Sequence, residues 1–183
     1  MTADSAIATI QSDSLSLDAF NFEPPPPDTR QRLLRFRLTD QDSGLLVLEE
    51  IAEVLQIPPT GILTVPGVPD EVLGVLNWRG DMLWLVDLNM LTGYPSLVDQ
   101  PAGLTTLIVL VIQARGRAVG LGVSQFEEVE LHDLTHLQPV ASGLFPSKLY
   151  HFIAGALPGD RGVVLRADSI LQCALWQPSK EQS

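Results

Sequence analysis

The sequence predicts a mainly β protein in which two small barrels pack against each other, with a few short helices. The 14 glycines and 14 prolines divide the chain into short segments, which is typical of sandwiches and barrels. Similar segments recur in both halves of the chain at a spacing of about 75–80 residues. One unit of this size buries too little apolar surface to be stable alone, so the main core is expected between the two units.

The first half is expected to consist of short strands separated by turn signals. These strands are predicted at residues 33–38, 45–48, 72–76 and 82–88. Residues 49–55 are either one helical turn or a further strand. Residues 57–69 carry closely spaced prolines and glycines that indicate a loop or a sheet edge. A short helix is expected at residues 89–92, with Asp87 capping its start and Gly93 its end.

The second half repeats this order. Its strands are predicted at residues 106–112, 118–123, 127–131, 152–156 and 162–166. Asp168 is expected to be the N-cap of a final short helix at residues 169–175. The sequence GLLV at Gly44 followed by Glu53 echoes GLGV at Gly120 followed by Glu128, and residues 74–91 echo residues 155–171 in the same way.

The ends of the chain differ in composition from its middle. Residues 1–31 are rich in small and polar residues and contain Phe20, Phe22 and, near their end, the tetraproline 24–27. We therefore expect a flexible extension. One domain is expected over residues 32–177, followed by a tail at 178–183. The repeat units within this domain are residues 33–93 and 105–175.

Charge and hydropathy exclude two classes of function. The net charge of −11, from 22 acidic and 11 basic residues, would repel nucleic acid. The longest apolar run, residues 107–112, is far shorter than the ~20 residues that span a bilayer, and the N-terminus lacks the pattern of a signal peptide. We therefore expect a cytoplasmic protein without direct membrane insertion.

A group of arginines forms a local exception to the acidic composition. Arg35 and Arg37 alternate with Leu34, Phe36 and Leu38, which is typical of a strand with one solvated face. A basic contact patch is the alternative interpretation of these arginines.

Candidate groups for catalysis are few. His132 and His136 are four residues apart, but they complete no metalloprotease motif, and solvated loop histidines are the favoured interpretation over a metal site with Asp133. The single Cys173 lies among apolar residues, as a small buried side chain would. No glycine-rich phosphate loop is present. We therefore expect no enzyme activity, no metal and no cofactor.

The segment between two predicted strands, residues 77–81, has an unusual composition. Asn77 and Gly80 favour a tight turn, and a five-residue hairpin connection is expected. Trp78 and Arg79 between them are residue types that are enriched at interface hot spots. Two interpretations remain: Trp78 folds back on the barrel while Arg79 pairs with a local carboxylate such as Asp81, or both residues contact a partner.

These features together resemble the CheW-like domain of bacterial chemosensory arrays. The most specific part is GVLNWRG at residues 74–80 followed by VDL at residues 86–88, which is similar to the family signature G-V-x-N-x-R-G…V-D-L. The resemblance covers about residues 33–176. Weaker matches in the same order support it, at residues 43–45, 53–54, 117–121, 128–129 and 161–165.

The resemblance implies two intertwined five-stranded SH3-like β-barrels that share a core. It also implies a non-enzymatic adaptor of two-component signal transduction, which couples the cytoplasmic tips of methyl-accepting chemoreceptors to a CheA-type histidine kinase. By position, the receptor-binding residues are Asn77, Arg79 and Gly80, to which we add Trp78 from its residue type, together with Thr106 and Leu107. The kinase-binding residues implied in the same way are Ile51 and Glu53.

Some positions depart from the family pattern. The family often has proline shortly after the Arg-Gly pair, where this chain has Trp84 and Leu85, and Ser43 replaces the usual aromatic residue. These departures suggest a specialised paralogue, for example in pilus-based or phototactic motility. The alternative function is a small-ligand-binding β-barrel, with a pocket lined by Trp78, Trp84 and Trp176.

Overall fold

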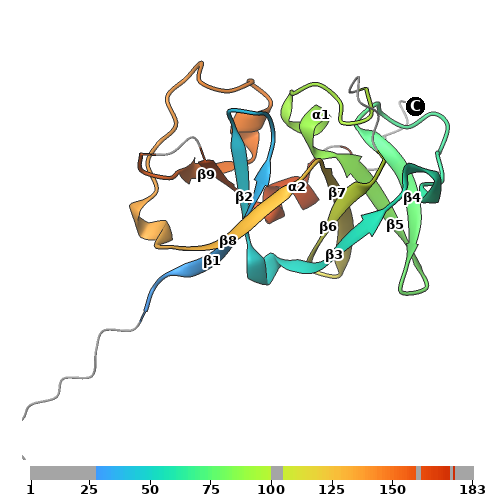
Figure 1. Ribbon diagram of the computed structural model, residues 1–183, viewed down its shortest axis with the longest axis horizontal. Helices are drawn as coiled ribbons and strands as arrows, with labels where there is room; N and C mark the ends of the chain where they lie inside the picture. The colour runs from blue at the N-terminus through green and yellow to red at the C-terminus, as the bar shows by residue number, and fades with distance from the viewer. Residues whose placement is uncertain (1–27, 100–104, 160–161, 174, 176–183) are drawn as a thin grey trace, which may run out of the picture.

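The computed structural model describes residues 28–99, 105–159, 162–173 and 175. Figure 1 shows two β-structures side by side with short helices between them. The first strand begins at Gln31, which is the last residue of the expected extension. Phe20, Phe22, the tetraproline and the tail at 178–183 lie outside the described residues.

The described residues form ten strands in two five-stranded sheets. The strands are β1 (Gln31–Arg37), β2 (Ser43–Val47), β3 (Ile51–Ile57), β4 (Val72–Trp78), β5 (Asp81–Asp87), β6 (Leu107–Ala114), β7 (Arg117–Val123), β8 (Phe126–His132), β9 (Ile153–Ala156) and β10 (Gly162–Leu165). Barrel A has the strand order β8-β1-β2-β10-β9, and barrel B has the order β3-β6-β7-β5-β4. Two short helices, α1 (Leu88–Thr92) and α2 (Ala167–Leu171), follow β5 and β10.

The two halves of the chain exchange strands. Barrel A combines β1 and β2 from the first half with β8, β9 and β10 from the second, and barrel B combines β3, β4 and β5 with β6 and β7. Replacing each strand by its counterpart five strands later converts one order into the other, as the sequence repeat requires. The parallel pairs β2–β10 and β5–β7 join the halves within each barrel. The mainly β fold with two intertwined five-stranded barrels is therefore confirmed.

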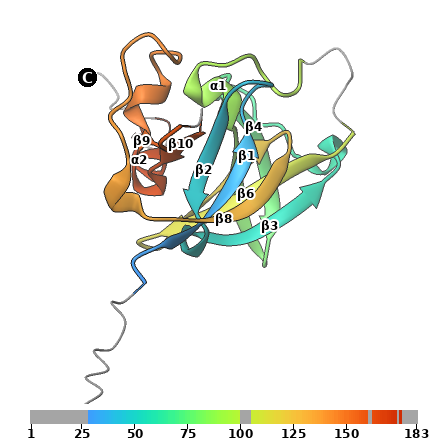
Figure 2. The same ribbon diagram turned by 60° about the vertical axis from the view of Figure 1, so that its left-hand side comes forward.

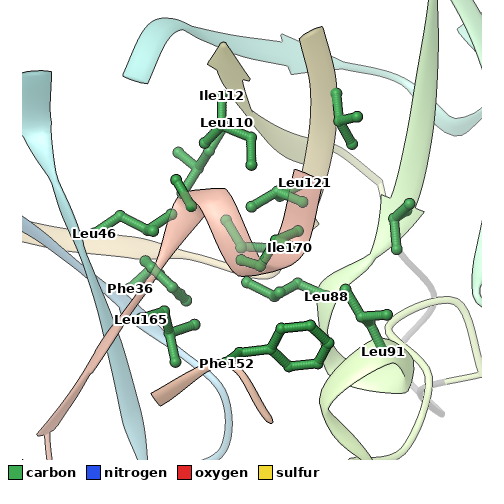
Figure 3. Close-up of a cluster of buried hydrophobic side chains, with 14 of the residues drawn as sticks. Phe36, Leu46, Leu88, Leu91, Leu110, Ile112, Leu121, Phe152, Leu165 and Ile170 are labelled. Carbon is green, nitrogen blue, oxygen red and sulfur yellow. The ribbon is translucent and has the colours of Figure 1, made fainter. Parts of the chain in front are cut away.

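The largest core lies between the barrels, as expected. Figure 3 shows Ile170 of α2 among side chains of both barrels, including Phe36 and Leu46 on one side and Leu110 and Leu121 on the other. Smaller cores fill barrel B and barrel A separately.

Strand β6 is apolar on both faces because it separates two of these cores. Its residues alternate between the interior of barrel B (Leu107, Val109 and Val111) and the shared core (Ile108, Leu110 and Ile112). A strand that is buried on both faces has a continuous apolar sequence instead of an alternating one. This explains the longest apolar run in the chain.

Residues 49–55 form both of the structures that the sequence allowed. The 3₁₀ turn Leu48–Glu50 leads directly into β3. Helix α1 has the expected caps, because Asp87 accepts a hydrogen bond from the amide of Met90 and Gly93 adopts a left-handed φ of 91°.

The expected cap of α2 is wrong. The N-cap is Arg166, whose backbone is still extended, and Asp168 lies inside the first turn. Asp168 therefore acts on the helix only as a negative charge near its start.

The interpretation of Arg35 as part of a solvated face is also wrong. Arg35 shares a face of β1 with Leu33, which packs in the core of barrel A, and only 9% of Arg35 is exposed. Strand β8, the neighbour of β1 in the sheet, places Glu130 opposite Leu33 and against the guanidinium group, where both carboxylate oxygens accept hydrogen bonds. His132 contacts the same carboxylate. The alternating pattern alone could not show this, because it does not reveal which strand lies beside β1.

Replacing Arg35 by alanine is expected to lower the free energy of unfolding at neutral pH by about 2–3 kcal/mol. The change leaves the carboxylate of Glu130, whose side chain is only 18% exposed, without its main cation. The hydrogen bond from Arg35 is the main cause that lowers the pKa of Glu130, so this stabilisation is present above the usual glutamate pKa and is lost as pH falls through the folded-state value. Urea unfolding at several pH values should show the difference from wild type narrowing in acid.

The matched control for this experiment is Arg37→Ala. Arg37 pairs with Glu127 on the same two strands, but its side chain is 41% exposed, so its loss should cost less than about 1 kcal/mol. Equal losses in the two variants, or a difference that does not depend on pH, would contradict the buried role of Arg35.

Candidate partner-binding site

The hairpin between β4 and β5 is tighter than the sequence predicted. Trp78 and Asp81 still pair in the ladder, so only Arg79 and Gly80 form the loop, and the expected five-residue connection is wrong. Both loop residues have positive φ, 54° and 92°, as the two central residues of a type I′ turn do. The side chain of Asn77 accepts a hydrogen bond from the amide of Gly80 at 3.3 Å, which helps to hold the turn.

Glu53 connects this hairpin to strand β3. The indole Nε1 of Trp78 donates to Oε2 of Glu53 at 2.7 Å, and the Nε of Arg79 donates to the same oxygen at 3.2 Å. Strands β3 and β4 are the two edges of the sheet of barrel B, so this contact crosses the place where the barrel closes. We call these three residues the Glu53–Trp78–Arg79 cluster.

The cluster holds a cation on the surface in a fixed position. The guanidinium carbon of Arg79 lies 4.8 Å from the centroid of the Trp78 ring, within the range of a cation–π contact. The Arg79 side chain nevertheless remains 64% exposed. The hydrogen bond from Trp78, and then the charge of Arg79, lower the pKa of Glu53, so its carboxylate stays ionised throughout the neutral range. An arginine held in this way loses little further freedom when it binds a partner.

The structure contains features of both interpretations of the hairpin. Trp78 packs back against the core of barrel B, and Arg79 pairs with a carboxylate, which is Glu53 of β3 and not the neighbouring Asp81. At the same time the guanidinium group faces solvent. The sequence could not reveal Glu53 as the partner, because the two residues are 26 positions apart and meet only when the barrel closes.

A bulge in β3 separates the two residues that the resemblance assigns to the kinase. Ile51 pairs with Ile112 and packs against the shared core, whereas Glu53 pairs with Val111, whose side chain lies inside barrel B. A bulge redirects the side chains that follow it. Ile51 and Glu53 therefore point in different directions, although they are only two residues apart.

The remaining two residues assigned to the receptor lie away from the cluster. Leu107 is fully buried in the core of barrel B, so its side chain offers no surface to a partner in this structure. It pairs with Ile57, four positions along β3 from Glu53, or about 13 Å at the usual rise of a strand. Thr106, next to Leu107, is exposed.

The histidines and the described tryptophans that the sequence singles out lie in different elements or on different faces. His132 ends β8, whereas His136 lies in the following 3₁₀ turn with Asp133 3.5 Å away. Within the described ranges, no three His, Cys, Asp or Glu side chains are grouped closely enough to hold a metal ion. Trp78 faces the core of barrel B, whereas Trp84 is on the opposite face of the hairpin. Trp176 lies outside the described residues.

Comparison with known proteins identifies the family. The model of the CheW-like domain matches residues 32–172, which is most of the chain. The chain belongs to the CheW-like domain family. Among solved structures, the scaffolding protein TtCheW from Thermoanaerobacter tengcongensis is 19% identical, with a TM-score of 0.61, and the similarity covers 75% of this chain and 89% of that one. No match is found among curated proteins.

In this CheW-like domain, some residues of the family signature shape the surface hairpin, and another stabilises the interior. Arg79 and Gly80 form the hairpin loop at the surface, and Asn77 near the end of β4 holds it through a hydrogen bond. Asp87 is fully buried and accepts hydrogen bonds from the amides of Met90 and Leu97 as well as from another side chain. Family membership assigns the protein to the scaffold proteins of chemotaxis signal transduction. No helix in the described part of the chain has the length and apolar character needed to cross a membrane.

Proposed function

We propose that this protein is a cytoplasmic, non-enzymatic adaptor that couples the tips of methyl-accepting chemoreceptors to a CheA-type histidine kinase. The observation that carries the proposal is the Glu53–Trp78–Arg79 cluster within a CheW-like domain. It presents one exposed guanidinium in a fixed orientation, which suits recognition of a carboxylate or of backbone carbonyls on a partner. The departures at Trp84 and Ser43 support a pathway for pilus-based or phototactic motility.

The cluster also gives a physical reason for coupling between the two partners. By resemblance Arg79 faces the receptor and Glu53 the kinase, and the two side chains are 3.0 Å apart. A receptor group that draws Arg79 away from Glu53 would leave the carboxylate free to change its hydrogen bonds. Occupation of one surface therefore changes the other through a single ion pair.

A reconstitution with the kinase and a receptor cytoplasmic fragment from the source cell tests this function. Kinase autophosphorylation should respond to the receptor fragment only when the adaptor is present, and both partners should be retained on the immobilised protein. Failure to retain either partner would contradict the proposal. A saturable change in tryptophan fluorescence with a metabolite would instead favour a ligand-binding barrel.

Glu53→Gln is the variant that tests the shared ion pair. Glutamine keeps an acceptor for the indole of Trp78 but removes the charge that holds Arg79, so binding of both partners should weaken. The matched control is Glu49→Gln, four residues before Glu53, which removes an exposed carboxylate that pairs with Arg32. Equal effects of the two variants would show that only net charge matters.

A further inference from the structure

Residues 138–145, with Ala156 and Leu157, form an apolar groove beside β9 of barrel A. Figures 1 and 2 show this segment at the end of the molecule away from the hairpin of β4 and β5. The volume of the groove is about 550 Å³. The side chains that form it are Pro139, Val140, Leu144, Phe145, Ala156 and Leu157. Leu144 is 57% exposed at its rim, so the groove presents apolar surface to solvent.

The wall of the groove is fixed by hydrogen bonds. The hydroxyl of Tyr150 donates to the carbonyl of Ala141 at 2.7 Å and accepts from the amides of Leu144 and Phe145 at 3.2 and 3.4 Å. On the opposite side, Gln138 forms a β-bridge with Ala156. A groove held in this way requires little rearrangement to bind an apolar group.

The charge around the groove differs from that of the rest of the chain. Residues 134–159 contain no Asp or Glu, although Asp133 and Asp160 flank them and the whole chain has a net charge of −11. They contain one Lys, Lys148, which also reaches Glu71, and the two histidines His136 and His151. Residues 1–27 have the opposite composition, with four acidic residues and no Lys or Arg. The segment that forms the groove therefore repels the acidic residues 1–27 less than the rest of the chain does.

The chain also enters the described domain close to this groove. Oγ1 of Thr29 donates to Oδ2 of Asp133 at 3.0 Å, and Asp133 begins the 3₁₀ turn that leads to the groove. Gln138 is five residues further on, at most about 17 Å away along the chain. In the other direction, a polyproline II spacing of about 3.1 Å per residue allows Phe22 to reach about 22 Å from Thr29, and Phe20 about 28 Å. Both aromatic side chains can therefore reach the groove of their own chain.

We propose that Phe20 and Phe22 occupy this groove in the same molecule, where none of the lining residues is acidic and would repel the carboxylates of Asp18 and Glu23. Phenylalanine side chains bury about 150–250 Å² each, which suits a cavity of this size. A short tether raises the local concentration of the segment to the millimolar range, so even weak intrinsic affinity fills the groove. The segment is thus a built-in ligand of barrel A.

Hydrogen exchange of the full chain tests the proposal. In the double variant Phe20→Ser and Phe22→Ser, the amides of Leu144 and Phe145 should exchange about two- to tenfold faster than in wild type. A tethered segment of weak intrinsic affinity slows the local opening of the groove by about this factor, and the variant loses that protection. The matched control is the double variant Ile7→Ser and Ile10→Ser, which removes apolar side chains further from the tether and should change nothing.

A second pair of variants tests the groove itself. Leu144→Asp places a negative charge on the rim and should speed exchange of the amides of residues 20–23. Leu63→Asp alters a 72% exposed leucine of barrel B and should leave them unchanged. Both leucines are exposed, so neither change should prevent folding.

Two outcomes would overturn the inference. One is exchange at residues 144–145 that is the same in wild type and in the phenylalanine variant. The other is protection that rises with protein concentration, because the segment would then occupy the groove of a second copy. Protection that is independent of concentration and is lost in both the phenylalanine and the Leu144 variants supports the intramolecular contact.

Discussion

Replacing Arg79 by alanine is expected to weaken binding of a chemoreceptor cytoplasmic fragment by about thirtyfold, or ~2 kcal/mol. The guanidinium is held by Glu53 and Trp78 and is still 64% exposed, so its loss removes a preorganised contact. The fold needs little from this side chain, and the unfolding midpoint should move by no more than about 2 °C. Binding and thermal unfolding should be measured on the same sample.

The chain provides a close control in Arg115→Ala. Arg115 also has a positive φ, 51°, and also precedes a glycine in a two-residue hairpin loop. Its side chain is 77% exposed and makes only a long contact of 3.5 Å with Asp168. The two variants lose the same charge from the same backbone conformation, so only Arg79→Ala should weaken receptor binding.

Arg79→Lys distinguishes geometry from charge. Lysine keeps the charge but lacks the planar fork and stacks less well on Trp78, so it should restore only part of the affinity. Complete restoration would reduce the role of Arg79 to a point charge. An Arg79→Ala protein that unfolds several degrees early, or binds the receptor normally, would make the cluster a purely structural clamp.

Replacing Asp87 by alanine is expected to lower the free energy of unfolding by about 3 kcal/mol or more. Its carboxylate is fully buried and accepts hydrogen bonds from the amides of Met90 and Leu97 and from the hydroxyl of Ser96. A helix cap alone is worth about 1 kcal/mol, but each further unsatisfied donor adds about 1–3 kcal/mol. The midpoint of thermal unfolding should fall by roughly 6–12 °C.

Asp87→Asn should lose about half as much stability. The asparagine side chain keeps one oxygen that accepts from the backbone amide of Met90. Its NH₂ group, however, is a donor and faces the backbone amide of Leu97, which needs an acceptor. Asp81→Ala removes an exposed carboxylate from the start of the same strand and should change stability by less than about 0.5 kcal/mol. A loss in Asp87→Ala no larger than that of a single cap would show that the loop after α1 repacks.

The repeat made most of the fold predictable from the sequence. Local patterns placed the strands, and the echo of Gly44 in Gly120 showed that two similar units exist. The burial of Arg35 and the pairing of Glu53 with Trp78 could not be predicted in this way. Both depend on which strands become neighbours, with β8 beside β1 in barrel A and β3 meeting β4 where barrel B closes, and sequence spacing does not encode this.

The candidate site was predictable in its types of residue but not in its arrangement. Trp78 and Arg79 were identified from their position in a polar hairpin, and the family signature supplied Asn77 and Gly80. Leu107 was assigned by position alone, although its strand is buried on both faces. The bulge that turns Glu53 away from Ile51 adds one residue to a strand and leaves no signal in the composition.

The exchange of strands has a consequence for how the protein is made on the ribosome. Barrel B is contiguous in the chain, from β3 to β7, whereas barrel A consists of the segments that precede and follow it. Between Val47, the end of β2, and Phe126, the start of β8, the ribosome adds 126 − 47 = 79 residues. At the usual 5–20 residues per second, the hairpin of β1 and β2 waits about 4–16 s for its neighbour β8. Barrel B can close during this interval and bring the two segments of barrel A together. Barrel B, which is inserted between them in the sequence, then acts as the template on which barrel A is completed.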